Sequence, residues 1–275
     1  MVALKRLKPI LIALAVSSMA SRTNATNYLQ TGNAYAAGLG NSVIAFPKAG
    51  FYQNQALLCS IDSLYIELYS SIPNHIKEFG NYSFFAATPA LKGYTAIHFG
   101  YFGYEHYNES KLGLAYALKL SDKISTGVQF NWLRTSISEP YGNYNQFIAE
   151  VGFSYQIIHT LNWGVHLYNP TLSKPVDDNL EKPVTAIRTG IAYSPMEQIT
   201  LMSELVQQIN QKTSFRAGID MEVSRNLNLQ VGYNHQPKTL HVGAGLEINS
   251  LRINLSIAYH NLLGLTPHFS IGKFF

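Results

Sequence analysis

The feature that most constrains this chain is an alternation of apolar and other residues with a period of two, repeated along most of its length. In the segment 251–260, every second residue is apolar: Leu251, Ile253, Leu255, Ile257 and Tyr259. In a helix, residues two positions apart point to opposite sides, whereas in a strand they share one face. The repeated alternation therefore predicts an all-β protein whose strands each have one apolar face.

Fourteen strands are predicted on this basis, joined by turns and loops. Their ranges are 62–70, 81–88, 93–105, 111–120, 123–135, 145–157, 160–168, 184–193, 198–208, 213–223, 226–234, 239–248, 251–260 and 267–275. Most have about nine to eleven residues, which is the length of a strand that crosses a bilayer at a tilt. The alternative is a soluble β-sandwich, but the strands of a sandwich are typically about five or six residues long.

Composition also favours a membrane barrel. Only 13% of the residues are charged, about half of the usual share in a soluble domain. The less apolar face of the strands carries Gly, Ala, Asn, Gln and Ser rather than Lys and Glu. The mean hydropathy of -0.01 argues against a bundle of transmembrane helices, each of which needs about 20 consecutive apolar residues. The low charge also argues against a disordered chain and against a nucleic-acid-binding protein.

The links between the predicted strands alternate in length. Links after even-numbered strands are tight and those after odd-numbered strands are usually longer, as in outer-membrane barrels with short periplasmic turns and longer extracellular loops. In the last strand, Phe269, Ile271 and Phe275 share one face, as expected of a C-terminal signal for the barrel-insertion machinery, although Lys273 departs from that pattern. We therefore predict a transmembrane antiparallel β-barrel of about 14 strands over residues 62–275, in the outer membrane of a Gram-negative cell.

Two segments precede the predicted barrel. Residues 1–20 combine the basic residues Lys5, Arg6 and Lys8 with a short apolar run and small residues before position 21. This layout predicts a cleaved secretory signal peptide, and an N-terminal membrane anchor is the alternative. Residues 21–61 show no alternation. They either hang in the periplasm or fold into the lumen, and we expect a luminal plug (hatch).

Two stretches within this segment carry a motif. Residues 33–46 read NAYAAGLGNSVIAF and residues 51–58 read FYQNQALL. They resemble the start of the PorV/PorQ-like proteins, which belong with the FadL-type outer-membrane transporters and share an Ala-x-x-Gly-x-Gly stretch followed by an aromatic residue and Asn-Pro-Ala. The matching plug-motif residues are Gly38, Gly40, Asn41, Asn54 and Ala56, and Gln55 stands where the family has Pro. The resemblance implies a fourteen-strand barrel with an N-terminal hatch, serving either hydrophobic transport or type IX protein secretion.

Ten charged residues are expected on the lumen-facing sides of the strands. They are Lys111, Lys119, Glu150, Arg188, Glu204, Arg216, Asp220, Glu222, Glu247 and Arg252. Five are positive and five are negative, whereas an open ion-selective pore is expected to show an excess of one sign. The balance predicts a paired network that fills and stiffens the lumen, although the sequence does not show which charges meet.

No residue pattern points to catalysis, to a metal or to a cofactor, so we predict a non-enzymatic protein. His106, Asn108 and Ser110 lie close together in residues 105–110, which superficially resembles an outer-membrane phospholipase. They are expected to fill a polar hairpin turn, where they could not share the strand face that such an enzyme needs. The nine histidines show no metal-ligand spacing supported by Cys or carboxylates.

Two glycines in one predicted strand bear on transport. Gly100 and Gly103 interrupt strand 93–105, and glycine inside a strand often marks a bulge or bend. A kink there would give a hydrophobic transporter a lateral exit. The alternative is that the glycines make room for neighbouring aromatic residues.

The sequence favours a component of type IX protein secretion or surface assembly, because balanced luminal charges suit a scaffold better than a lipid path. The alternatives are a FadL-like transporter of hydrophobic small molecules and a structural barrel with no transport role. The expected partners are outer-membrane lipid, the barrel-insertion machinery, and either secretion-system proteins or hydrophobic small molecules. Nucleic acid is not an expected partner.

Overall fold

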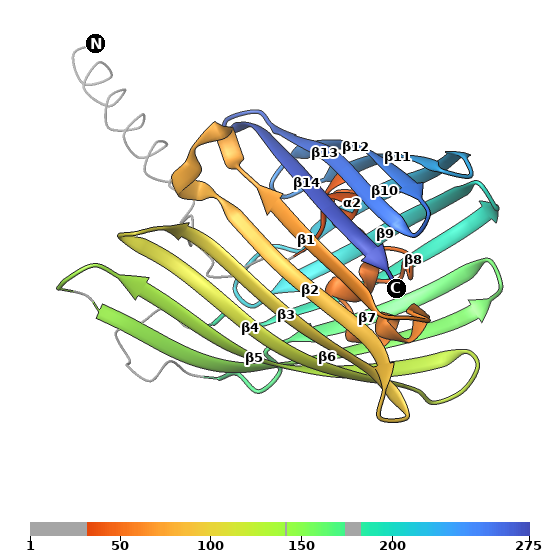
Figure 1. Cartoon of the computed structure of the whole chain (residues 1–275), viewed down its shortest axis with the longest axis horizontal. Helices are drawn as coiled ribbons and strands as arrows, with labels where there is room; N and C mark the ends of the chain where they lie inside the picture. Colours follow the sequence, from red (N-terminus) through yellow and green to blue (C-terminus); the bar gives the residue numbers. More distant parts are fainter. Residues whose placement is uncertain (1–31, 141, 174–182) are drawn as a thin grey trace, which may run out of the picture.

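The computed structural model describes residues 32–140, 142–173 and 183–275, and the predicted signal peptide at residues 1–20 lies outside them. The described chain forms a closed antiparallel barrel of fourteen strands, in which each strand pairs with the next and β14 pairs with β1 (Figure 1). The strands are β1 (Tyr65–Ser71), β2 (Asn81–Ala90), β3 (Gly93–Tyr104), β4 (Tyr107–Lys119), β5 (Ile124–Ile137), β6 (Gly142–Ile158), β7 (Leu161–Tyr168), β8 (Ala186–Met196), β9 (Ile199–Gln208), β10 (Ser214–Ser224), β11 (Leu227–Asn234), β12 (Thr239–Ile248), β13 (Leu251–His260) and β14 (Gly264–Phe274).

The predictions of an all-β class, of fourteen strands and of an antiparallel order are confirmed. One detail is wrong, because the segment 105–110 is not a hairpin turn. Only residues 105–106 form the turn, whereas Tyr107 to Ser110 already pair with β3 and β5. The pairing extends this far because β5 is a long strand of 14 residues that offers β4 partners up to Tyr107.

Side chains that point away from the barrel axis are apolar and exposed, whereas those that point inward are polar and buried. On β13, Leu255 is 58% exposed and its neighbour Asn254 is 3% exposed. On β11, Val231 is exposed and Gln230 is buried. An apolar outer surface around a polar interior is the arrangement of a transmembrane barrel. In the part of the chain that the structure describes, no helix is long and apolar enough to span a bilayer.

The two ends of the barrel differ in the length of their links. At one end, two-residue turns such as Leu91-Lys92 and Asn249-Ser250 join neighbouring strands, and all four residues have positive φ, as in type I′ hairpin turns. At the other end most links are longer, such as the one from β7 to β8 over residues 169–185, and the two-residue turn 105–106 between β3 and β4 is an exception. β1 begins and β14 ends at the end with the short turns, which we call the short-turn end.

The link between β1 and β2 covers part of β3 at the long-loop end. It contains two short 3-10 helices, η3 (Pro73–His75) and η4 (Lys77–Phe79), and η4 packs on β3. There the Gly103 N–H donates to the Gly80 carbonyl at 3.1 Å, and Gly103 has a φ of +104°. β3 nevertheless pairs in unbroken register with β4 through both glycines and with β2 through Gly100, whereas Gly103 lies just beyond the last pair with β2. The lateral exit predicted at these glycines stays a prediction.

Residues 32–61 precede β1 and lie inside the barrel (Figure 1). They contain the helix α2 (Ala34–Gly38) and the 3-10 helices η1 (Gly50–Tyr52) and η2 (Gln55–Ser60). α2 packs on the inner side of β11 to β14, and η2 packs on the inner side of β3 to β6. This luminal segment, as we call residues 32–61, thus connects two sides of the barrel wall.

Closure of the barrel has a measurable consequence. Every strand has two hydrogen-bonded neighbours, so detergent finds no free strand edge from which to unfold the sheet. We expect the protein to fractionate with outer membranes and to change its mobility in SDS gels when it is boiled. A soluble periplasmic protein with the same mobility before and after boiling would contradict the membrane barrel.

Candidate functional site in the barrel interior

Two asparagines shape the luminal segment. Asn33 precedes α2, and its side-chain oxygen accepts a hydrogen bond from the Ala36 N–H at 2.8 Å. Asn54 precedes η2 in the same way and accepts from the Ala56 N–H at 3.1 Å. Such caps satisfy amide groups at the start of a helix. The Asn54 side chain also donates to the Ile44 carbonyl at 2.8 Å, so it joins the two halves of the segment.

The wall of the barrel approaches the segment most closely at glycines. A Cβ atom added at Gly152 would collide with the Asn54 side chain, and one at Gly164 would collide with the Ile44 carbonyl. Both glycines lie on inward-facing positions of β6 and β7. The absence of a side chain at these two positions therefore creates the space that the backbone of the segment occupies.

The two motif glycines make a similar approach on the other side of the barrel. At Gly38, an added Cβ would lie 3.2 Å from the Gly243 Cα on β12. Gly40 has a φ of +63° and lies against Gly232 on β11. A residue with a side chain would be strained in this backbone conformation. In this Gly-x-Gly pattern, Gly38 allows close packing against β12 and Gly40 allows the positive φ of the backbone.

A buried carboxylate on β6 is the centre of the first polar cluster. One oxygen of Glu150 accepts from Lys111 Nζ at 2.9 Å and from Asn131 Nδ2 at 2.8 Å. The other oxygen lies 2.9 Å from His166 Nε2 and accepts from Gln55 Nε2 at 2.9 Å. Three of these partners belong to the wall and Gln55 belongs to the luminal segment. Hydrogen bonds to both oxygens compensate for the loss of hydration of this carboxylate.

A second cluster forms around Glu204 on β9. Its carboxylate accepts from Arg188 Nε at 2.6 Å and from the Ile44 N–H at 3.3 Å. The same guanidinium donates to the Asn41 carbonyl at 3.0 Å and to Gln53 Oε1 at 2.6 Å. Arg188 therefore neutralises a wall carboxylate and at the same time holds two points of the luminal segment. The fork geometry of arginine suits such a double role.

Two tyrosines of the luminal segment donate to wall carboxylates. Tyr52 donates to Glu67, which also accepts from the Tyr65 hydroxyl at 2.5 Å. Tyr35 donates to Asp220 at 2.8 Å. Burial, together with the nearby Glu67 carboxylate, raises the pKa of Tyr52 well above its ordinary value. The Tyr52 hydroxyl therefore stays protonated and keeps its role as a donor.

Most of the ten charges predicted for the lumen form ion pairs, some in the two buried clusters and others near the short-turn end. The pairs are Lys111 with Glu150, Arg188 and Arg216 with Glu204, Asp220 and Glu222 with Lys48, and Arg252 with Glu247. Lys119 instead stands 5.5 Å from the centre of the Tyr94 ring and is exposed. The predicted insertion-signal residues lie on β14 and just after it: Phe269 is exposed, Ile271 is half-buried and Phe275 is exposed.

Sequence reasoning missed three residues of these clusters. Glu67 lies between Tyr65 and Tyr69 on the inward face of β1, which reads as an aromatic face. Lys48 lies in the segment without alternation, so no face could be assigned to it. His166 lies on the inward face of β7, but nothing in the sequence connects it with Glu150. Pairing register was the missing information, because it decides which inward side chains are neighbours.

Among the described residues, no group of three or more His, Cys, Asp or Glu side chains is placed to hold a metal ion. In the segment 105–110, His106 Nδ1 lies 3.0 Å from Ser138 Oγ on an exposed turn.

The outer surface has an apolar hollow of about 410 Å³ where β14, β1, β2 and β3 lie side by side. Ser70 lies in it, between the larger residues Phe269 and Tyr82 that flank it on the neighbouring strands. Phe84 and Phe99 form another part of its lining. A small residue among aromatic ones leaves a depression on a surface that otherwise faces lipid.

Comparison with known proteins shows the fold. No family model and no curated protein matches the chain. Among solved structures, it is similar to the Pseudomonas putida toluene transporter TodX, with 10% identity over 90% of this chain and 99% of that chain and a TM-score of 0.66. The monoaromatic hydrocarbon channel CymD has 12% identity over 91% of this chain and 99% of that chain, with a TM-score of 0.63. A Pseudomonas aeruginosa FadL homologue has 10% identity over 88% of this chain and 97% of that chain, with a TM-score of 0.59. The chain is therefore a closed 14-strand antiparallel barrel with the fold of FadL-type outer-membrane barrels.

Proposed function

We propose that this protein is an outer-membrane transporter of small hydrophobic molecules, with the luminal segment as its plug. The observation that carries the proposal is the filled interior. Residues 32–61 are bonded to both sides of the wall, so the barrel lacks the wide aqueous lumen of a diffusion pore. The fold is shared with a monoaromatic hydrocarbon channel and a toluene transporter, whereas large porins leave an aqueous channel.

The charges support the same conclusion. An ion channel needs charges that are available to the passing ion, whereas Lys111, Glu150, Arg188 and Glu204 are buried and bonded to one another. A hydrophobic solute instead needs apolar contacts near the membrane. The hollow around Ser70 supplies such contacts on the lipid-facing side, next to β3.

The secretion role favoured by the sequence and the specific PorV/PorQ relation have no support from the comparisons, which include no secretion protein among the structures named above. The observations therefore support a transporter most directly.

The proposal is tested by uptake in a strain that lacks the gene. Re-expression of the protein is expected to raise uptake of labelled toluene but not of a sugar of similar size, because the polar lumen is filled. Ser70→Phe should reduce toluene uptake by filling the hollow, whereas Ala244→Phe, on the outward face of β12, should not.

Two results would contradict the proposal. The first is equal permeation by toluene and the sugar. The second is unchanged toluene uptake in the deletion strain together with lost secretion of surface proteins, which would instead support the secretion role.

A further inference from the structure

The outward faces of the described strands carry only two charged residues, Arg134 on β5 and Lys273 on β14, and both are cationic. Every other Asp, Glu, Lys or Arg of these strands lies on the inward face. A charge on the lipid-facing surface of a barrel is costly in the middle of the bilayer and tolerated near the head groups. The two cations accordingly lie at opposite ends of the barrel, Arg134 towards the long loops and Lys273 towards the short turns.

The register of β4, β5 and β6, which lie side by side in the barrel (Figure 1), places Arg134 in a polar row. Ser110 and Asn145 are its direct cross-strand neighbours. Adjacent strands are about 4.8 Å apart, so three side chains that can donate hydrogen bonds lie within about 10 Å of one another. Arg134 and Asn145 are exposed, and Ser110 is half-buried.

An apolar row lies directly below this polar row, towards the middle of the barrel. It consists of Leu112, Trp132 and Phe147, which pair in the same register. Phe147 is 72% exposed, as expected of a side chain that faces lipid. The step between the two rows is therefore the edge of the apolar band that surrounds the barrel, where the hydrocarbon of a bilayer gives way to its head groups.

Trp132 fixes the orientation of the Asn145 side chain. Trp132 Nε1 donates to Asn145 Oδ1 at 3.0 Å. Because an indole nitrogen is only a donor, the amide oxygen faces Trp132 and the amide nitrogen of Asn145 keeps its N–H groups for another acceptor. Arg134 forms no ion pair with a carboxylate of the described residues. The polar row thus presents a cation and further donors but no acid.

The other outward cation has different surroundings. The cross-strand neighbours of Lys273 are Ile66 and Leu251, which are apolar. Lys273 Nζ lies 4.9 Å from the centre of the Phe275 ring. A lysine in such a place extends along the apolar surface to bring its charge to water, but no neighbouring side chain in its row can donate to an anion with it.

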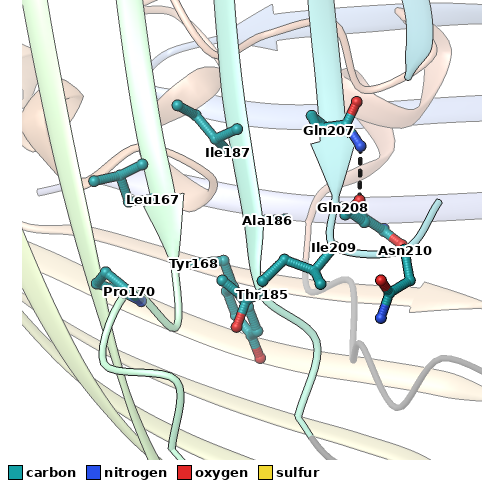
Figure 2. Close-up of a pocket in the computed structure, with 10 residues that line it drawn as sticks. All are labelled: Leu167, Tyr168, Pro170, Thr185, Ala186, Ile187, Gln207, Gln208, Ile209 and Asn210. Carbon is teal, nitrogen blue, oxygen red and sulfur yellow. Dashed lines mark hydrogen bonds between the residues drawn. The ribbon is translucent and has the colours of Figure 1, made fainter. Parts of the chain in front are cut away.

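Another side of the long-loop end also lacks a row of this kind. On β7, β8 and β9 the outward neighbours are Leu167, Ile187 and Gln207, which border a pocket of about 330 Å³ (Figure 2). The Gln207 amide donates to the carbonyls of Gln208 and Gln211 at 2.7 Å each, and Figure 2 marks the first of these bonds. None of the ten residues that line the pocket is charged, so an anion would find no counter-charge there.

We propose that the row of Ser110, Arg134 and Asn145 binds the phosphate group of a membrane lipid in the leaflet at the long-loop end. The guanidinium donates two parallel hydrogen bonds to the phosphate, and the Asn145 amide and the Ser110 hydroxyl donate to its other oxygens. An acyl chain of the same lipid lies along the apolar row below. That row is the reason for choosing a lipid over a soluble phosphate, and the inference does not depend on the transport function.

The test compares lipid A with and without its phosphate groups, because the long loops of outer-membrane barrels face the outside of the cell. Binding to the full protein in detergent micelles is measured by native mass spectrometry. The wild type should bind the phosphorylated form roughly tenfold or more tightly, as expected for hydrogen bonds to a charged group. Arg134→Gln should remove this preference and leave binding of the dephosphorylated form unchanged. Arg134→Lys keeps the charge but not the fork, and should retain only part of the preference.

Two further variants separate the row from a general attraction between charges. Lys273→Gln is the matched control, because it removes the other outward cation, which has no donors beside it. It should keep the wild-type preference. Asn145→Leu leaves the net charge unchanged and should lower the preference. All four side-chain changes lie on exposed positions, so the mobility shift on boiling should persist and show that the barrel is folded.

The inference is overturned if the wild type binds the two forms of lipid A equally. It is also overturned if Lys273→Gln reduces the preference as much as Arg134→Gln does, because binding would then follow net charge. An unchanged preference in Asn145→Leu would contradict the role of the row. Excess inorganic phosphate should not displace lipid A, because it has no acyl chain, and complete displacement would indicate a site for a soluble anion instead.

Discussion

Deletion of residues 32–60 is expected to convert a closed barrel into an open channel in planar bilayers. The luminal segment fills the space between the wall strands, and its backbone contacts the wall at Gly152, Gly164 and Gly232. The interior of an eight-stranded barrel is just wide enough for its own side chains to fill, and a barrel of fourteen strands is wider. Once the segment is absent, discrete conductance steps should replace a flat baseline.

The wall should stay folded in this deletion, because most of its buried charges have partners within the wall. Lys111 and His166 remain with Glu150, and Arg188 remains with Glu204. A retained mobility shift on boiling would check this. Baseline conductance in a folded deletion variant would show that the wall side chains alone close the lumen.

A point variant tests the same idea without deletion. A valine at Gly164 would collide with the Ile44 carbonyl, so Gly164→Val should displace the segment and produce intermittent openings. Ala244→Val adds the same kind of side chain on the outward face of β12 and should remain closed. Identical traces for the two variants would contradict the role of the glycine.

Glu150→Ala is expected to lower the free energy of unfolding by about 3–5 kcal/mol, because it leaves the buried Lys111 ammonium without its counter-charge. The matched comparison is Glu247→Ala. Both carboxylates lie 2.9 Å from their cationic partners, but Glu247 and Arg252 are partly exposed. Removal of the exposed pair should cost no more than about 1 kcal/mol. Urea unfolding in detergent micelles, followed by tryptophan fluorescence, measures both.

A double variant separates charge from packing. Lys111→Met with Glu150→Leu replaces the buried pair by apolar groups, which is often neutral in other proteins. It should recover part of the lost stability, although Asn131 and Gln55 would lose their acceptor. Equal losses for Glu150→Ala and Glu247→Ala would contradict the importance of burial.

Much of the fold follows from residue pattern alone. Strands β12 and β13 begin and end at the predicted residues, because alternation there is strict and a two-residue turn at 249–250 separates them. The start of β4 was missed because Asn108, Glu109 and Ser110 are polar on both faces. Near the loops both faces of a strand meet polar surroundings, so the pattern that marks a strand disappears while its pairing continues.

The interior site was less predictable for a physical reason. Lys111 and Glu150 lie on β4 and β6, with β5 between them, and are 39 residues apart in the chain. Their contact depends on the register of two successive strand pairs, which single-strand patterns do not contain. The attachment points of the luminal segment depend in addition on how a non-repetitive chain turns inside the barrel. Inward charges could be named from the sequence, but not their neighbours.

The division of bonds around Glu150 and Arg188 bears on how this protein can change over generations. Wall residues supply three of the four partners of Glu150 described above, and Glu204 of the wall neutralises Arg188. The luminal segment adds backbone carbonyls and uncharged amides, such as the Asn41 carbonyl and the Gln55 side chain. The charges of Glu150 and Arg188 therefore do not depend on a charged side chain of the segment, unlike that of Asp220, which pairs with Lys48 and accepts from Tyr35. At these two clusters the side chains of the segment can therefore change over generations while the wall keeps its own charge pairs.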